Sequence, residues 1–176
     1  MAERVIAIYP GSFDPVTNGH LDIIERSSSI FDSVIVAVLI NVAKQPLFSI
    51  DERLEMLRDV TGRWENVEVA SFEGLLVNYA VSRKAHVILR GIRAVTDYDY
   101  EFQMALMNRR MQPTIETIFM VPAEAYSYLS SSMVKEVCAL GGSVSGLVPS
   151  CVEASLKHKF QKKAIGQKLM DKGKEV

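Results

Sequence analysis

Cysteine, tryptophan and net charge are all scarce in this sequence. Its 176 residues include two cysteines and one tryptophan, and the formal net charge at pH 7 is −1. Cys138 and Cys151 have neither the number nor the spacing of a disulfide framework or a metal site, which favours the reducing cytoplasm as the compartment. A net charge so close to zero gives no indication of nucleic acid or a membrane as a partner.

Long apolar runs are also missing. No stretch approaches the roughly 20 apolar residues of a transmembrane helix, and the first residues lack the basic region, apolar core and cleavage site of a secretory signal. Hydrophobic residues still make up 48% of the chain and charged residues 23%, which is typical of a globular protein. We therefore expect a cytoplasmic protein with one core and no membrane contact.

Segments of strand and helix character alternate along the chain. The predicted strands are Val5–Tyr9, Val34–Leu39, Val67–Val69, Ala85–Leu89 and Glu116–Val121. The predicted helices are His20–Phe31, a helix opened by a capping box at Ser49 and Glu52 and ending near Gly62, Leu75–Lys84, Asp97–Met111, Ser131–Leu140 and Val152–Phe160. This alternation predicts an α/β fold: a single-domain, doubly wound, five-stranded parallel sheet of Rossmann-like type, with helices on both faces.

The predicted domain covers residues 1–160, and residues 161–176 form a lysine-rich C-terminal tail. The tail carries five lysines against Asp171 and Glu175, a net charge of +3. Gly166 and Gly173 weaken any helix there by about 1 kcal/mol each relative to alanine, so we expect a solvated, frayed extension. A nucleic-acid-binding arm is the alternative, although lysines without aromatic residues give it little support.

The ten residues from Gly11 to His20 carry the most specific signal in the chain. They read Gly-Ser-Phe-Asp-Pro-Val-Thr-Asn-Gly-His and join a predicted strand to a predicted helix. Such a turn can direct several backbone N–H groups at an anion, helped by the helix dipole, and His20 adds a side-chain donor there. An ordinary strand–helix turn is the alternative, but it does not require two glycines, a hydroxyl and an imidazole at fixed spacing.

Candidate ligand-binding residues, most of them polar, follow the carboxyl ends of all five predicted strands. In chain order they are Ser12 and His20, then Lys44, then Gly74 and Leu75, then Arg90 and Arg93, then Tyr126 to Ser132. Ligands of open α/β sheets bind outside the carboxyl ends of the strands, at the point where the strand order reverses. The five loops therefore predict one shared ligand-binding crevice.

Two of these loops hold groups suited to phosphate. Arg90 and Arg93 flank Gly91, and a guanidinium group matches phosphate oxygens while a glycine lets the backbone approach a ligand. The alternative is that both arginines bridge to carboxylates of the next helix, namely Asp97, Asp99 and Glu101. That acidic run could also ligate a metal, although decoration of a helix N-terminus is the commoner meaning.

Three serines, at positions 130 to 132, precede a predicted helix, and capping needs only one of them. The surplus hydroxyls indicate a second anion site. No Ser-His-Asp, Cys-His, HExxH, CxxC, GxxxxGK[ST] or GxGxxG pattern occurs in the chain. A site rich in cations and donors and poor in nucleophiles fits phosphoryl or nucleotidyl transfer between two substrates.

The turn before the first helix resembles the signature of the nucleotidylyltransferase superfamily, carried here by Thr17, Gly19 and His20. The whole pattern resembles the bacterial phosphopantetheine adenylyltransferase family, with Arg90-Gly91-Ile92-Arg93 followed by Tyr100-Glu101, and Tyr126-Ser127-x-x-Ser130-Ser131-Ser132. The likeness extends from about Arg4 to Phe160. It implies a nucleotidylyltransferase fold and transfer of AMP from ATP to 4′-phosphopantetheine, giving dephospho-coenzyme A and pyrophosphate.

Carried over by position, the resemblance assigns catalysis to His20, Lys44 and Arg93. It assigns ATP binding to Ser12, Phe13 (through its backbone), His20, Gly91, Ile92, Arg93, Glu101, Tyr126, Ser127, Tyr128, Leu129, Ser130, Ser131 and Ser132. It assigns phosphopantetheine binding to Ser12, Lys44, Leu76 and Arg90. Ser12 replaces the family's usual threonine and keeps the hydroxyl, and Leu76 replaces a methionine of some members at nearly constant volume.

The resemblance also implies Mg²⁺ as cofactor, without a protein metal site, as well as a homohexamer and feedback inhibition by coenzyme A. The implied reaction is an in-line attack of the 4′-phosphate on the α-phosphorus of ATP. Three alternatives remain open at this point. They are a nucleotidylyltransferase for nicotinamide mononucleotide or a phosphorylated alcohol, a nucleotide-binding regulatory module without catalysis, and a nucleic-acid accessory protein.

Overall fold

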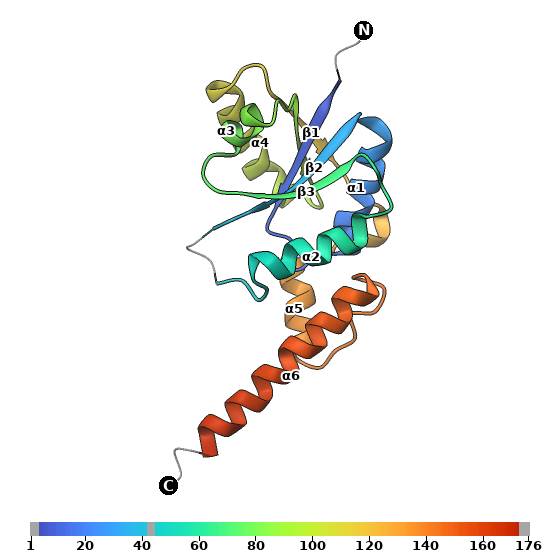
Figure 1. The fold of residues 1–176 in the computed structure, drawn as a ribbon, viewed down its shortest axis with the longest axis vertical. Coiled ribbons are helices and arrows are strands. Elements are labelled where there is room, and N and C mark those ends of the chain that lie inside the picture. Colours follow the sequence, from blue (N-terminus) through green and yellow to red (C-terminus); the bar gives the residue numbers. More distant parts are fainter. Residues whose placement is uncertain (1–3, 42–44, 173–176) are drawn as a thin grey trace.

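A sheet of five parallel strands forms the centre of the fold. The computed structural model describes residues 4–41 and 45–172. Its strands are β1 (Ile6–Gly11), β2 (Ser33–Leu39), β3 (Val67–Phe72), β4 (Val87–Gly91) and β5 (Glu116–Met120). They lie in the order β3-β2-β1-β4-β5, and every pairing is parallel (Figure 1). The predicted fold class is confirmed.

Helices connect these strands and continue beyond the last one. They are α1 (Asn18–Ile30), α2 (Ile50–Thr61), α3 (Leu76–Ser82), α4 (Val95–Met111), α5 (Ser131–Ala139) and α6 (Ser150–Lys172), with a 3₁₀ turn at Glu124–Tyr126. The predicted capping box of α2 is present, since Ser49 and Glu52 exchange hydrogen bonds of 3.2 and 2.8 Å. Within the described ranges, no helix is both long enough and apolar enough to cross a membrane.

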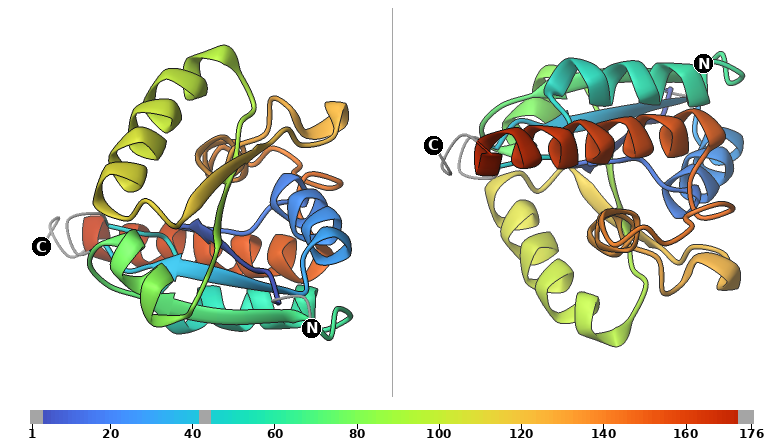
Figure 2. Two further views of the ribbon diagram at one scale, coloured as in Figure 1. Left: turned by 90° about the horizontal axis from the view of Figure 1, so that it is seen from above. Right: turned by 90° about the horizontal axis from the view of Figure 1, so that it is seen from below.

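Alternating side chains divide the core between the two faces of the sheet. Ala7 and Tyr9 of β1 belong to the core that α1, α2, α5 and α6 cover. Ile8 between them belongs to a separate core on the opposite face, covered by α3. Helices on both sides of the sheet are visible in Figure 2. Burial on both faces explains why β2 reads as a continuous apolar run in the sequence.

The strand order reverses between β1 and β4. From β1 the chain proceeds outward to β2 and β3, and it then returns to β4 on the other side of β1. Gly11 and Gly91 are the last residues of these two neighbouring strands. The Gly11–His20 turn and the arginine loop therefore leave the sheet side by side, at the position where open α/β sheets bind ligands.

Some predicted boundaries are wrong. Strand β3 continues to Phe72 rather than ending at Val69, and Arg90 and Gly91 are the last residues of β4 rather than part of the loop after it. The largest difference is α6, which was expected to end at Phe160 and instead continues to Lys172, extending away from the domain in Figure 1. A helix end at Phe160 is thus incorrect, whereas the solvated lysine-rich tail stays a prediction. Gly166 does not end the helix, because one glycine costs only about 1 kcal/mol.

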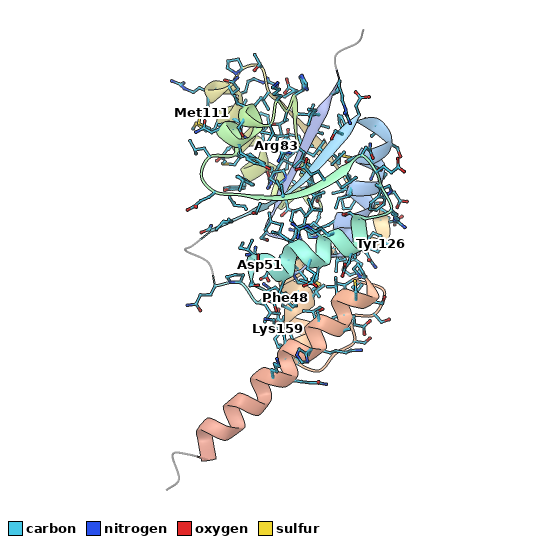
Figure 3. The ribbon with its side chains drawn as sticks, in the orientation of Figure 1. Phe48, Asp51, Arg83, Met111, Tyr126 and Lys159 are labelled. Carbon is cyan, nitrogen blue, oxygen red and sulfur yellow. The ribbon has the colours of Figure 1, made fainter. Side chains whose placement is uncertain are left out.

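The first part of α6 packs against α2. The Lys159 ammonium lies 5.6 Å from the centre of the Phe48 ring and 2.7 Å from a carboxylate oxygen of Glu52, and Figure 3 labels Phe48 and Lys159 side by side. Val152 and Leu156 of the same helix are buried in the core that α1, α2 and α5 also cover. Residues of the first part of α6 therefore pack on the domain.

Helix α4 leaves most of its apolar surface uncovered. It stands beside β5 and extends away from the rest of the domain (Figure 2). Its exposed apolar and aromatic residues are Val95, Tyr98, Tyr100, Phe102, Met104, Leu106, Met107 and Met111. So many exposed apolar and aromatic side chains on one helix are typical of a surface that contacts another protein.

Candidate active site

A cavity of about 310 Å³ opens at the carboxyl ends of β1 and β4. Several of the predicted site residues line it, namely Ser12, His20, Arg90, Gly91, Arg93, Glu101, Tyr126, Leu129, Ser130, Ser131 and Ser132. They come from the end of β4, from the loops after β1 and β4, from α1 and α4, and from the stretch that runs from the 3₁₀ turn to the first residues of α5. The predicted convergence of loops on one crevice is thus confirmed for those after β1, β4 and β5. It is wrong for the loop after β3, because Gly74 and Leu75 do not line the cavity.

Other predicted residues lie outside this cavity. Phe13 is buried in the core with its side chain, and Leu76 packs against the core covered by α3. Ile92, Ser127 and Tyr128 do not line the cavity, and Tyr128 is exposed. Lys44 falls outside the described residues, so its predicted catalytic role stays a prediction.

His20 is held in one tautomer by the first turn of α1. Thr17 is the N-cap of this helix, and its backbone N–H donates to Nδ1 of His20 over 3.0 Å. Because a backbone N–H can only donate, Nδ1 carries no proton, and the proton of the neutral ring resides on Nε2. The imidazole takes the place that glutamate usually occupies in a capping box. Nε2–H is therefore the donor that His20 can offer to a ligand.

Burial keeps the His20 ring neutral. Desolvation, together with the positive charge of Arg93, lowers the pKa of His20 to about 4. The rings of Phe13 and Tyr9 lie 5.1 and 6.4 Å from the imidazole, centre to centre, and form an aromatic wall behind it. At neutral pH His20 thus acts as an uncharged hydrogen-bond donor, and the arginines supply the positive charge.

Both arginines of the Arg90–Arg93 segment pair with α4. Arg90 Nε donates to Glu101 Oε2 over 2.6 Å, Nη2 donates to the other carboxylate oxygen, and Nη1 donates to the Pro10 carbonyl over 3.2 Å. Arg93 donates to both carboxylate oxygens of Asp97, over 3.1 and 3.3 Å. The bridges foreseen as the alternative to phosphate binding do form, yet both guanidinium groups still line the cavity.

Gly91 also contributes to packing, beside its effect on ligand approach. A Cβ atom at this position would lie 2.8 Å from Cδ1 of Ile23 and 3.4 Å from the Tyr9 hydroxyl. Since real Cβ atoms do not come closer than about 3.0 Å to a neighbour, any other residue would make the end of the Ile23 side chain shift. The glycine therefore lets α1 and Tyr9 pack directly on the end of β4.

The three serines have three different partners. Ser130 is the N-cap of α5 and accepts from the N–H of Met133 over 3.1 Å. Ser131 donates to the Pro15 carbonyl over 2.7 Å, which ties α5 to the Gly11–His20 turn. Ser132 is exposed at the cavity. One of the two hydroxyls predicted to be surplus thus has a structural partner, and Ser132 faces the ligand space.

A buried carboxylate fastens the same turn from below. Asp14 accepts from the backbone N–H groups of Leu47 and Phe48 over 3.0 and 2.9 Å, and Lys135 Nζ lies 2.6 Å from Oδ2. Burial acts to raise the pKa of Asp14, but the hydrogen bonds from Lys135 and the two amides outweigh it and lower the pKa. Asp14 therefore links the turn to α5 and to the segment before α2.

Sequence reasoning missed several residues of the cavity wall. These are Tyr9, Pro10, Ile23 and Pro122, whereas Gly11, Thr17 and Gly19 belong to the turn that the sequence had singled out, and Asp97 was named as a partner of the arginines. Tyr9 is the most informative, because burial raises the pKa of its hydroxyl despite Arg90 and Arg93 nearby, so the group stays a protonated donor. A tyrosine in an otherwise aliphatic strand, directly before the motif, was the signal available in the sequence.

Chemically, the cavity offers an uncharged imidazole donor, two guanidinium groups, hydroxyls and the N-terminus of α5. These groups favour an anion with several oxygens, as a triphosphate has. Such a cavity at the strand-order reversal of a parallel α/β sheet defines a nucleotide-binding protein of the nucleotidyltransferase class. The comparison with protein families agrees, since a model described as cytidylyltransferase-like matches residues 8–137.

Curated relatives narrow the class further. A phosphopantetheine adenylyltransferase from Carboxydothermus hydrogenoformans is 55% identical over 157 residues, which cover 89% of this chain and 97% of the relative. One from Clostridium botulinum is 58% identical over 144 residues, covering 82% and 91%. The chain belongs to the phosphopantetheine adenylyltransferase family.

Solved structures share the fold at low identity. One is a crystal structure from Vibrio parahaemolyticus whose assignment as a nicotinate-nucleotide adenylyltransferase is provisional; it has a TM-score of 0.67 and 17% identity and covers 90% of this chain and 95% of that one. Another, a lipopolysaccharide core biosynthesis protein from Thermoplasma volcanium, has a TM-score of 0.53 and 18% identity, covering 69% and 100%. These likenesses concern the fold alone.

Proposed function

We infer that this protein transfers AMP from ATP to 4′-phosphopantetheine, producing dephospho-coenzyme A and pyrophosphate. The observation that carries the proposal is the cavity at the β1–β4 reversal, where the Nε2–H of His20 and the guanidinium groups of Arg90 and Arg93 face the same space. Membership of the phosphopantetheine adenylyltransferase family supports 4′-phosphopantetheine as the acceptor substrate. A binding module without catalysis would not need an imidazole fixed as a neutral donor beside two cations.

In this mechanism the protein positions two substrates and supplies no nucleophile. The 4′-phosphate oxygen attacks the α-phosphorus of ATP, the bond to the bridging oxygen breaks, and pyrophosphate leaves in line. His20 donates to the α-phosphoryl oxygen as its charge grows. Arg93 and the N-terminus of α5 hold the β- and γ-phosphates, whereas Arg90 holds the acceptor phosphate. Lys44, by family likeness, acts with His20 at the reacting phosphates.

Mg²⁺ belongs to this proposal as the companion of ATP. Asp97 and Glu101 are the carboxylates that line the cavity, and each already engages an arginine. Phosphate oxygens and water therefore provide the ligands for the ion, as is usual for Mg²⁺ at nucleotide sites. When bound, the ion neutralises charge on the phosphates.

A pyrophosphate-release assay with ATP and a panel of phosphorylated acceptors tests the proposed activity. We expect release with 4′-phosphopantetheine and not with nicotinamide mononucleotide, nicotinate mononucleotide or a phosphorylated alcohol. Mass spectrometry of the product identifies dephospho-coenzyme A. Preference for a mononucleotide would instead make the chain a different nucleotidyltransferase, and ATP binding without release of pyrophosphate would make it a regulatory module.

Arg90 and Arg93 are expected to serve different substrates. Replacing Arg90 by alanine removes a charged donor near the acceptor phosphate, which costs about 1.5–3 kcal/mol, or roughly 10- to 100-fold in phosphopantetheine affinity. Calorimetry should show ATP affinity largely retained, and Arg93→Ala should give the opposite pattern. Because Arg90→Ala leaves Glu101 unpaired, the single variant Glu101→Gln is measured beside it, to show how much of any change in ATP affinity comes from that carboxylate. Loss of ATP affinity alone in Arg90→Ala would overturn this division.

We also propose a homohexamer in the cytoplasm with coenzyme A as feedback inhibitor. The uncovered apolar face of α4 supports self-association, and the two free thiols suit a reducing compartment. Coenzyme A contains both phosphopantetheine and an adenine nucleotide, so it fits the space of both substrates. Light scattering should give six times the mass of one chain, and coenzyme A should inhibit in competition with ATP or phosphopantetheine.

The end of α6 is expected to be dispensable for catalysis. Truncation after Phe160 keeps Val152, Leu156 and the contact of Lys159 with Phe48, which hold this helix on the domain. Turnover and mass in solution should therefore match those of the full chain. A fall in turnover, or dissociation seen by light scattering, would show that residues 161–172 dock on the domain or on another subunit.

A further inference from the structure

We propose that Arg53 is a positioning residue that holds the Ser12–Phe13 peptide with its N–H directed at the nucleotide phosphates. Arg53 comes from α2 and is 4% exposed, which is rare for an arginine. Its Nη1 donates to the Ser12 carbonyl over 2.9 Å, and its Nε donates to the Ser49 carbonyl over 3.3 Å. The inference rests on the proposed function, since it assigns a task within the same cavity.

Because a peptide group is planar, the contact between Arg53 and the Ser12 carbonyl also fixes the direction of the Phe13 N–H. In a planar trans peptide, the C=O and the following N–H point in opposite directions. Gly11 and Ser12 line the cavity and Arg53 does not, so Arg53 holds the Ser12 carbonyl from the side away from the cavity. The Phe13 N–H is thereby directed to the cavity side. Among the described residues it has no acceptor, and it is free for a phosphate oxygen.

Backbone strain shows that this orientation needs to be held. Phe13 has a φ of 44°, in the left-handed region that residues other than glycine avoid. Flipping the Ser12–Phe13 peptide by about half a turn would bring φ into the ordinary extended region. The flipped peptide would point the Ser12 carbonyl at the phosphates and the N–H away from them. A buried cation on that carbonyl opposes the flip.

Charge around Arg53 explains why the cation is tolerated there. Asp14 lies close enough to stabilise the guanidinium group electrostatically, although desolvation is the larger influence and lowers the pKa of Arg53. Asp14 itself is fixed by Lys135 and by two backbone amides. A lysine at position 53 would keep the charge, but its single ammonium group cannot reproduce the planar fork that bridges two carbonyls.

The test replaces Arg53 by methionine, which keeps much of the volume and removes the donors. We expect ATP affinity to fall about tenfold by calorimetry and turnover to fall about 10- to 100-fold, with the KM for phosphopantetheine little changed. In NMR spectra of protein labelled with ¹⁵N-phenylalanine, the Phe13 amide should shift on ATP binding in the wild type and not in the variant. Arg58→Met, an exposed position of the same helix, is the matched control and should leave all three readouts unchanged.

Arg53→Lys is the second variant and should give intermediate losses. If thermal unfolding shows that Arg53→Met does not fold, the same measurements are made on Arg53→Lys instead. A folded variant at position 53 with wild-type ATP affinity and a Phe13 amide that still shifts with ATP would overturn the inference. ATP binding and the amide shift are measured without any acceptor. They therefore test the role of Arg53 independently of the pyrophosphate-release assay, which tests the proposed activity. Failure of the wild type to form dephospho-coenzyme A would contradict the proposed function alone.

Discussion

His20→Ala should lower turnover about 100- to 1,000-fold while changing ATP affinity much less. The reason is that the Nε2–H of His20 meets charge that grows on the α-phosphoryl oxygen during the reaction. Removing one such preorganised donor raises the barrier by about 2.7–4 kcal/mol. Steady-state kinetics give the loss of turnover, and calorimetry with ATP gives the affinity. An interaction formed mainly in the transition state should appear in kcat and hardly in binding.

Two controls separate this role from general damage. His158→Ala removes an exposed histidine of α6 and should leave turnover unchanged. His20→Asn places a neutral amide donor on a shorter side chain and should recover part of the loss if the hydrogen bond is what matters. Turnover of His20→Ala within a few-fold of the wild type would show that the imidazole is only a helix cap.

The same histidine links stability to pH. Its pKa is about 4 in the folded protein and about 6.5 in an unfolded chain, so between these values only the unfolded state takes up the proton. The wild type should therefore lose stability as the pH falls from 6.5 towards 4, and His20→Ala should lack this component. Urea unfolding at pH 7 and pH 5 measures the difference. An equal pH dependence in both proteins would mean that His20 is protonated in the folded state.

Local sequence signals were sufficient for the architecture but not for the ends of its elements. The alternation of β-rich runs with amphipathic segments predicted five parallel strands, and the capping box placed the start of α2 correctly. Strand β3 was predicted three residues short. The sequence from Ala70 to Phe72 has little strand character, and these residues are part of the strand because they pair with Ala37 to Leu39 of β2. Strand order, which locates the cavity, also depends on pairings distant in sequence.

The candidate site, too, was only partly predictable from local sequence signals. Polar groups after the strand ends were visible in the sequence, so most of the cavity wall could be named in advance. The tautomer of His20 could not be, because it depends on a contact with the Thr17 N–H. Arg53 was overlooked although a signal existed: it falls on the apolar stripe of its helix, between Ile50, Leu54 and Leu57. A charged residue in such a stripe is either exposed by a break in the pattern or buried for a purpose.

Lys135→Met should destabilise the protein by about 3 kcal/mol, because it leaves the Asp14 carboxylate buried without its closest cation. Breaking a buried ion pair by removing one partner costs about 3–5 kcal/mol. The low end is expected here, since the Lys135 side chain is 28% exposed and Arg53 still lies near Asp14. In a domain of this size the change lowers the melting temperature by about 6–12 °C. Lys157→Met, which removes the exposed partner of Glu153, is the matched control and should change stability little.

The pH dependence of the Lys135→Met effect identifies its cause. In the wild type the pKa of Asp14 is lowered, so the ion pair stabilises the fold above the unfolded pKa of about 4 and is lost as the pH falls through the folded value. The difference in unfolding free energy between wild type and Lys135→Met should therefore be largest near pH 7 and shrink towards pH 3. A difference that stays constant with pH would mean that the variant lost packing by the lysine stem. Because Asp14 also fixes the turn that carries Ser12 and Phe13, the variant should lose ATP affinity at neutral pH together with stability.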